Sequence, residues 1–253
     1  MSRMVMRMRR AVRPVVLAGL VLSAAAGVGA AQGPGTAGKE IKYVRDSEEY
    51  ATLTRQVYRL ALRQVGAARD ALPRGRPWAV VLDVAQTALD DAVYMLERQA
   101  YGVPHDTMAY GAWRAREDAD AVPGVADFIA GVRRLGGRVA WISNDQASTR
   151  EHIRANLAKV LVWNDGDLLC LPAADTSYTK RARRTEVTSG TGACAWPGQP
   201  VAVLAYVGDA LGDFPAAGEA DADAGNDAAF GVRYFLLPNP MYGSWERQVT
   251  RRR

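Results

Sequence analysis

The chain has 253 residues, of which 49% are hydrophobic and 23% charged. This composition fits one α/β domain with a sizeable core and a small accessory element, and it excludes a fibrous or compositionally disordered protein. The formal net charge is +5, and five arginines within the first thirteen residues account for all of it. The rest of the chain is neutral, so there is no general electrostatic basis for nucleic-acid binding. With two histidines, His105 and His152, a histidine-rich zinc site is also disfavoured.

The first 31 residues have the pattern of a signal peptide. A basic stretch without acids precedes the apolar run 14–28, and small residues at 29–31 suit cleavage. The apolar run is short for a membrane span, which needs about 20 residues, and no cysteine follows it directly to carry a lipid. An uncleaved anchor is the alternative. We therefore expect a signal peptide over 1–31, a secreted or periplasmic protein with no stable membrane anchor after cleavage, and a flexible linker over 32–42.

Beyond the linker, helical and strand patterns alternate. Apolar residues recur with helical spacing from Ser47 to about Asp70, after Pro123, and over 147–159. Short apolar runs predict buried strands at 78–82, 138–142, 168–171, 201–207 and 234–237. Alternating strands and helices predict a right-handed βαβ arrangement around a parallel sheet.

Polar residues follow three of the predicted strands, namely Asp83, Ser143 and Asp209. Each of them alone is more often a turn residue or a helix cap. In open α/β sheets, however, ligands bind at the carboxyl ends of the strands. We therefore expect these side chains to converge at one site.

Four segments carry a more specific signal. They are the stretch 80–90, the stretch 140–144, Lys180 within the basic run 178–184, and the stretch 206–214. In this order they resemble the four motifs of the haloacid dehalogenase superfamily, and more narrowly those of subfamily IIIB, the class C bacterial acid phosphatases and 5′-nucleotidases. The signature Gly-Asp-x-Leu-x-Asp-Phe is complete at 208–214, and the closing segment 237–246 is also similar.

The resemblance covers roughly residues 45–247 and implies a Rossmann-like parallel sheet flanked by helices. An acid phosphatase domain would occupy 43–253, with a small helical cap between 88 and 122. Asp83 would be the nucleophile that forms an aspartyl-phosphate. The resemblance further implies Mg²⁺ ligands at Asp83, the backbone carbonyl of Ala85, Asp209 and Asp213, and phosphate contacts from Ser143, Asn144 and Lys180.

Two aromatic residues match positions that flank the substrate in the family. Trp113 and Tyr242 would stack on a nucleobase or another flat leaving group. The alternative is that both are ordinary aromatic residues of the core or the cleft rim.

One position departs from the family pattern. Ala85 stands where the family has a second aspartate, the general acid and base, so binding should persist while turnover suffers. Asp90 and Asp91 are nearby acids, although the sequence does not show that they can substitute. No lysine lies between Asp83 and Ser143, which disfavours Schiff-base chemistry. Asp145 stands where the family often has arginine.

The resemblance thus predicts a Mg²⁺-dependent phosphomonoesterase that acts outside the cytoplasm on a small phosphomonoester, with 5′-nucleotides as candidate substrates. The first alternative is a weak or inactive pseudophosphatase that binds Mg²⁺ and a phosphorylated ligand. The second is a structural protein without a ligand. In an exported protein Cys170 and Cys194 could form a disulfide, or both could remain buried thiols.

Overall fold

A computed structural model describes residues 37–172, 178–219, 222 and 226–248 of the chain. The predicted signal peptide (1–31) and the first part of the predicted linker (32–36) lie outside the described residues. Within the described part, no helix is both long and apolar enough to cross a membrane.

In this part of the chain, five parallel strands form one sheet in the order β3-β2-β1-β4-β5. The strands are β1 (Trp78–Leu82), β2 (Arg138–Ile142), β3 (Leu168–Cys170), β4 (Ala202–Gly208) and β5 (Tyr234–Leu236). Each of the five predicted strands is present within one or two residues of its expected bounds. The sheet and its flanking helices confirm the predicted fold class.

The described residues form seven α-helices, which flank the sheet or lie beyond its end. They are α1 (Lys39–Asp46), α2 (Glu48–Asp70), α3 (Ala92–Ala100), α4 (Thr107–Arg114), α5 (Val125–Arg134), α6 (Arg150–Lys159) and α7 (Lys180–Ser189). The chain also contains short 3₁₀ helices, namely η1 (Ala147–Thr149), η2 (Leu211–Asp213), η3 (Asn226–Ala229) and η4 (Ser244–Arg247).

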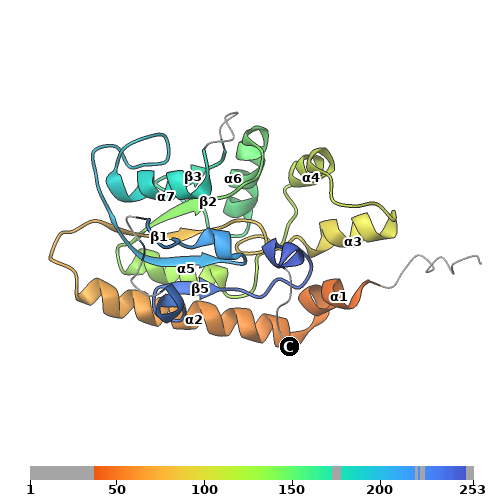
Figure 1. Cartoon of the computed structure of the whole chain (residues 1–253), viewed down its shortest axis with the longest axis horizontal. Coiled ribbons are helices and arrows are strands. Elements are labelled where there is room, and N and C mark those ends of the chain that lie inside the picture. Colours follow the sequence, from red (N-terminus) through yellow and green to blue (C-terminus); the bar gives the residue numbers. More distant parts are fainter. Residues whose placement is uncertain (1–36, 173–177, 220–221, 223–225, 249–253) are drawn as a thin grey trace, which may run out of the picture. The chain divides into compact units, whose positions relative to one another are not determined.

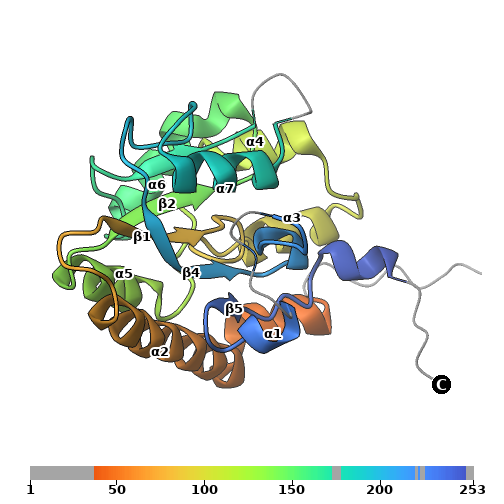
Figure 2. The same ribbon diagram turned by 60° about the vertical axis from the view of Figure 1, so that its left-hand side comes forward.

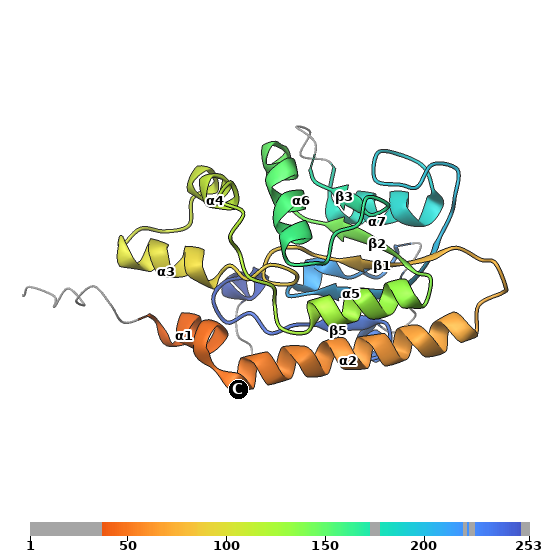
Figure 3. The same ribbon diagram turned by 180° about the vertical axis from the view of Figure 1, so that it is seen from behind.

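Two hydrophobic clusters cover the two faces of the sheet. Along β1, Val80 and Leu82 belong to the larger cluster with residues of α2, α5 and α6, whereas Ala79 and Val81 belong to the smaller one with Val187 of α7. This alternation follows from the two-residue period of a strand. Figure 1 shows α7 on the near face, and Figure 3 shows α2, α5 and α6 on the opposite face.

The segment between β1 and β2 contains two helices beyond the end of the sheet. These helices, α3 and α4, occupy the predicted cap region 88–122 (Figure 2). The predicted linker is wrong over 39–42, because these residues form the start of α1. Ile41 and Val44 are buried in a third cluster with Ala92 of α3. Helix α1 is only eight residues long. Its short amphipathic pattern could not be distinguished in the sequence from the end of the glycine- and alanine-rich stretch before it.

Cys170 and Cys194 form a disulfide, with their Cα atoms 5.4 Å apart. The bond joins the end of β3 to the loop that follows α7. That loop begins at Gly190, which has a φ of 72° and ends the helix in the left-handed conformation. The structure therefore decides between the two alternatives that the sequence left open.

We expect the double substitution Cys170→Ser and Cys194→Ser to lower the free energy of unfolding by about 3 kcal/mol, because a cross-link over a loop of this length restricts the unfolded chain. Urea denaturation of oxidised wild type and variant measures the difference. Thiol reduction of the wild type should give the same decrease. An unchanged urea midpoint in both cases would show that the bond does not restrain the chain.

Candidate active site

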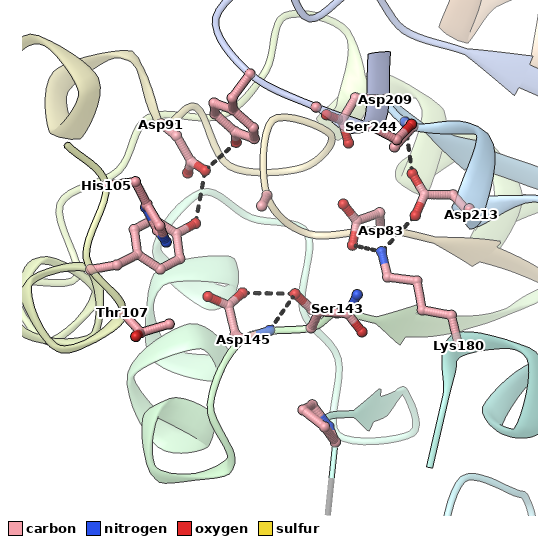
Figure 4. A pocket seen from close by; sticks show the side chains of 18 of the residues that line it. Asp83, Asp91, His105, Thr107, Ser143, Asp145, Lys180, Asp209, Asp213 and Ser244 are labelled. Atoms are coloured by element: carbon pink, nitrogen blue, oxygen red, sulfur yellow. Dashed lines mark hydrogen bonds and ion pairs between the residues drawn. The ribbon is translucent and has the colours of Figure 1, made fainter. Parts of the chain in front are cut away.

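A cleft of ≈ 900 Å³ opens at the carboxyl end of the sheet. Residues from the strand ends, the cap helices and the C-terminal segment line it, among them Asp83, Ser143, Asp209, Tyr94, Tyr110 and Tyr242. This is the edge at which the sequence predicted a site. Figure 4 shows the cleft from close by.

Three carboxylates and one ammonium group meet in the cleft. Oxygen atoms of Asp83, Asp209 and Asp213 lie within 4.8 Å of one another. The Nζ atom of Lys180 donates to Oδ1 of Asp83 at 2.6 Å and to Oδ1 of Asp213 at 2.5 Å (Figure 4). Asp83 and Asp209 directly follow β1 and β4, Asp213 ends η2 and Lys180 begins α7. The fold thus brings together side chains up to 130 positions apart in the sequence.

Close backbone packing holds the two acids after β4 in place. A Cβ atom at Gly208 would lie 2.3 Å from Oδ2 of Asp213, so glycine is needed for this approach. The backbone N–H of Ala210 donates to the same oxygen at 2.9 Å. Asn239 donates from Nδ2 to Oδ2 of Asp209 at 2.8 Å. Asn239 was not predicted as a site residue, because it lies three positions beyond the end of β5, whereas Asp83 directly follows β1.

The cluster is electrostatically unbalanced. Burial raises the pKa of Asp83, Lys180 lowers it, and the neighbouring carboxylates of Asp213 and Asp209 raise it again. Burial and then Asp213 raise the pKa of Asp209 to about 6. Burial lowers the pKa of Lys180, but Asp83 and Asp213 raise it by more. Three carboxylates with one ammonium group leave excess negative charge, and a hard cation with oxygen ligands such as Mg²⁺ fits this donor set.

Ala85 lines the cleft beside Asp83 and offers only a methyl group. Asp91 also lines the cleft, but its Oδ2 accepts from the hydroxyls of Tyr110 (2.8 Å) and Tyr242 (2.6 Å). Nη2 of Arg114 lies 3.3 Å from Oδ1 of Asp91. Burial raises the pKa of Asp91 above its usual value, although Arg114, Tyr242 and Tyr110 act in the opposite direction. The carboxylate is thus engaged with three partners, and both of its oxygens face them rather than a free position in the cleft.

The side chain of Asp90 contacts the start of α3. Its Oδ1 accepts from the backbone N–H of Ala92 at 2.7 Å, at the start of α3. Burial is the largest cause that raises its pKa to about 6, against this hydrogen bond. Neither acid thus occupies the place of the missing general acid.

Trp113 was predicted to flank the substrate, but it is not among the residues that line the cleft. It is 2% exposed and belongs to the larger core cluster, where its ring stacks on Tyr110 with centroids 5.7 Å apart. Tyr110, one helical turn earlier, lines the cleft instead. A helix presents only one of its faces to the cleft, and the motif match did not show which. Tyr242 does line the cleft, as its predicted role requires.

The loop after β2 is fixed by a residue that the sequence analysis missed. Arg183 of α7 is 1% exposed and donates to the carbonyls of Ser143 and Cys170 at 2.5 and 3.0 Å. It also donates to Oδ1 of Asn144 at 2.6 Å. Burial lowers the pKa of its guanidinium. The run 178–184 is so basic that it resembled a solvated surface, and only the spacing from Lys180 to Arg183, nearly one turn, hints that both point inward.

The fold and the Asp–Lys cluster fit a phosphatase with an aspartate at the tip of its first strand. Residues 24–245 match the model of the haloacid dehalogenase superfamily, subfamily IIIB (acid phosphatase), and the chain belongs to this family. It is therefore classed as a phosphomonoester hydrolase, in agreement with the resemblance read from the motifs.

Solved structures share the fold. The chain is similar to the class C acid phosphatase from Bacillus anthracis, with a TM-score of 0.66 and 24% identity over 82% of this chain and 85% of that chain. A second structure of that protein, with tungstate bound, gives a TM-score of 0.64 at the same identity and coverage.

The raised pKa of Asp90 predicts how stability depends on pH. The folded state holds the proton more tightly than the unfolded state, so the free energy of unfolding should fall as the pH rises from about 4 to about 6. Asn at this position keeps an acceptor for Ala92 and removes the charge. Asp90→Asn should therefore flatten the profile and raise the free energy of unfolding above pH 6 by roughly 1–2 kcal/mol.

Urea unfolding at several pH values measures this effect. Asp70→Asn is the control, because the Asp70 side chain is 71% exposed and its profile should follow that of the wild type. If Asp90→Asn also follows the wild type, Asp90 does not hold its proton in the folded state.

Proposed function

We propose that the protein hydrolyses small phosphomonoesters with the help of Mg²⁺, through a covalent aspartyl-phosphate on Asp83. The observation that carries the proposal is the contact of Lys180 with both Asp83 and Asp213 beside Asp209. The carboxylates of Asp83, Asp209 and Asp213 and the carbonyl of Ala85 would hold the ion. When bound, Mg²⁺ would neutralise charge on the phosphoryl oxygens and on the attacking carboxylate.

The residues of the chain divide the chemistry among them. An oxygen of Asp83 forms a bond to phosphorus while the ester P–O bond breaks, and water later releases phosphate from the acyl-phosphate. Lys180 stabilises the negative charge of the transferring group, and the loop of Ser143 and Asn144 positions it. The leaving oxygen needs a proton, which the methyl group of Ala85 cannot give. Turnover should therefore be slow on esters of poor leaving groups.

The aromatic lining of the cleft favours a substrate with a flat leaving group. Tyr94, His105, Tyr110 and Tyr242 line it on the side of the cap and the C-terminal segment. Aromatic side chains stack on nucleobases, so 5′-nucleotides are the substrate class that we propose. The disulfide between Cys170 and Cys194 supports the proposal that the protein acts in an oxidising compartment, secreted or periplasmic.

Restoring the missing acid tests the mechanism. Ala85→Asp should raise kcat on an alkyl phosphate or a nucleotide by about 10²-fold or more, the contribution of a general acid. An activated aryl phosphate should gain much less, because its leaving group needs little protonation. Steady-state assays with and without Mg²⁺ measure both substrates.

Two variants control this experiment. The asparagine of Ala85→Asn is nearly the same size as aspartate but is not an acid, so this variant should not raise kcat. Asp83→Asn should abolish turnover both in the wild type and in Ala85→Asp. Equal gains from Asp and Asn at position 85, or no gain from Asp, would contradict our account of the defect.

The binding protein without turnover remains the second candidate. The observation that favours it is the absence of an available acid near Asp83 among the described residues, since Asp91 is held by Tyr110, Tyr242 and Arg114. Under either candidate Mg²⁺ should raise the Tm, and Asp209→Asn should remove the increase. A Tm increase without hydrolysis of an aryl phosphate would favour the binder, and no response to Mg²⁺ or phosphate would favour a structural protein.

A further inference from the structure

Contacts with the described residues leave the hydroxyl of Ser143 one free hydrogen-bonding position. It donates its proton to Oδ2 of Asp145 at 2.7 Å, and its oxygen accepts from the backbone N–H of Asp145 at 3.2 Å (Figure 4). A serine hydroxyl has one donor and two acceptor positions. What remains for a ligand in the cleft is one lone pair, so Ser143 in this arrangement can accept a hydrogen bond but cannot donate one.

Neighbouring residues hold this arrangement from both sides. Nε of Arg114 lies 3.4 Å from Oδ1 of Asp145, and both side chains are almost fully buried. Arg183 donates to the carbonyl of Ser143 and to the side-chain oxygen of Asn144. The backbone of the loop and the carboxylate of Asp145 are thus fixed, and the side-chain amide of Asn144 keeps its N–H donors for a ligand.

An unprotonated oxyanion fits such a position poorly. Its oxygen atoms are acceptors, and against the lone pair of Ser143 they would form no hydrogen bond. A phosphoryl group that carries a proton can donate P–O–H to Oγ of Ser143, which in turn donates to Asp145. Phosphomonoesters carry that proton below about pH 6, the second pKa of the group.

We propose that Ser143 and Asp145 form a proton-accepting pair that selects the phosphoryl group in its protonated, monoanionic form and rejects sulfate. This rests on the proposed function in one respect, namely that the phosphoryl group binds at the end of β2. Asp145 is then a specificity-determining residue. Its negative charge is tolerated in an anion-binding cleft because it orients the Ser143 hydroxyl as an acceptor for the protonated ligand. The substrate class is narrowed to phosphomonoester monoanions, and sulfate esters are excluded.

Competition between inorganic phosphate and sulfate tests the pair. The two ions have the same shape, but at a pH of about 5 phosphate is protonated and sulfate is not. Calorimetric titration of the full chain with Mg²⁺ present should give a preference for phosphate on the order of 10- to 100-fold, the effect of one hydrogen bond in which one partner is an ion. In Asp145→Asn the amide can donate to Ser143, so the preference should fall below about threefold.

Asp91→Asn is the matched control. Asp91 also lines the cleft and contacts Arg114, so its loss removes the same charge without touching Ser143. Both anions should then bind more tightly by similar factors, and the preference should stay as in the wild type. An equal loss of preference in Asp91→Asn and Asp145→Asn would assign the effect to charge alone and overturn the pair.

Ser143→Ala separates the two possible roles of the hydroxyl. If Ser143 accepts from the ligand, this variant should weaken phosphate binding and leave sulfate binding no weaker. If Ser143 donates to the ligand, both anions lose affinity equally, and the proposal fails. It also fails if the wild type binds sulfate within about threefold of phosphate.

An aryl phosphate assay on the same samples keeps the two proposals apart. Hydrolysis without anion preference would overturn only the selecting pair. Anion preference without hydrolysis would support the pair and contradict the proposed turnover. Far-UV circular dichroism and the Tm of each variant show that it is folded, and where Asp145→Asn does not fold, Ser143→Ala decides the question.

Discussion

The contact between Lys180 and two aspartates is the interaction on which the site depends. Asp83, Asp209 and Asp213 are close enough for their carboxylates to repel one another strongly, and water screens them little because Asp83 and Asp213 are buried and Asp209 is partly buried. A parallel sheet brings its strand ends together at one edge, so the fold itself creates this repulsion. Lys180, the first residue of α7, inserts its ammonium group between Asp83 and Asp213 and offsets part of it.

The strands and the strand-end residues could be predicted because their signals are local. A short apolar run between turn residues indicates a buried strand, and the topology of a parallel sheet then places the following residue at the ligand-binding edge. Asp83, Ser143 and Asp209 were found in this way. Asn239 lies three positions beyond the end of β5, and its amide has no distinctive chemistry in a sequence, so the same rule does not single it out.

Other features depend on contacts that no local pattern encodes. The inward direction of Arg183 and Arg114 depends on the carbonyls and carboxylates that surround them, which come from other strands and helices. The disulfide depends on the distance between two positions 24 residues apart. Tyr110 and Trp113 lie about one turn apart on α4, and the rotation of the helix about its axis decides which of the two rings reaches the cleft. This rotation also depends on tertiary contacts. The motif resemblance identified the family but could not supply that rotation.

Gly208 makes the geometry of the site sensitive to a substitution outside its acidic residues. The backbone of β4 and the carboxylate of Asp213 are so close that even one methyl group at this position has no room. Replacing the glycine would displace an oxygen donor while leaving every acidic residue in the chain. A relative that keeps all its aspartates and its lysine but carries a larger residue here could therefore lose its affinity for a cation, and a survey of acidic residues alone would count it as intact.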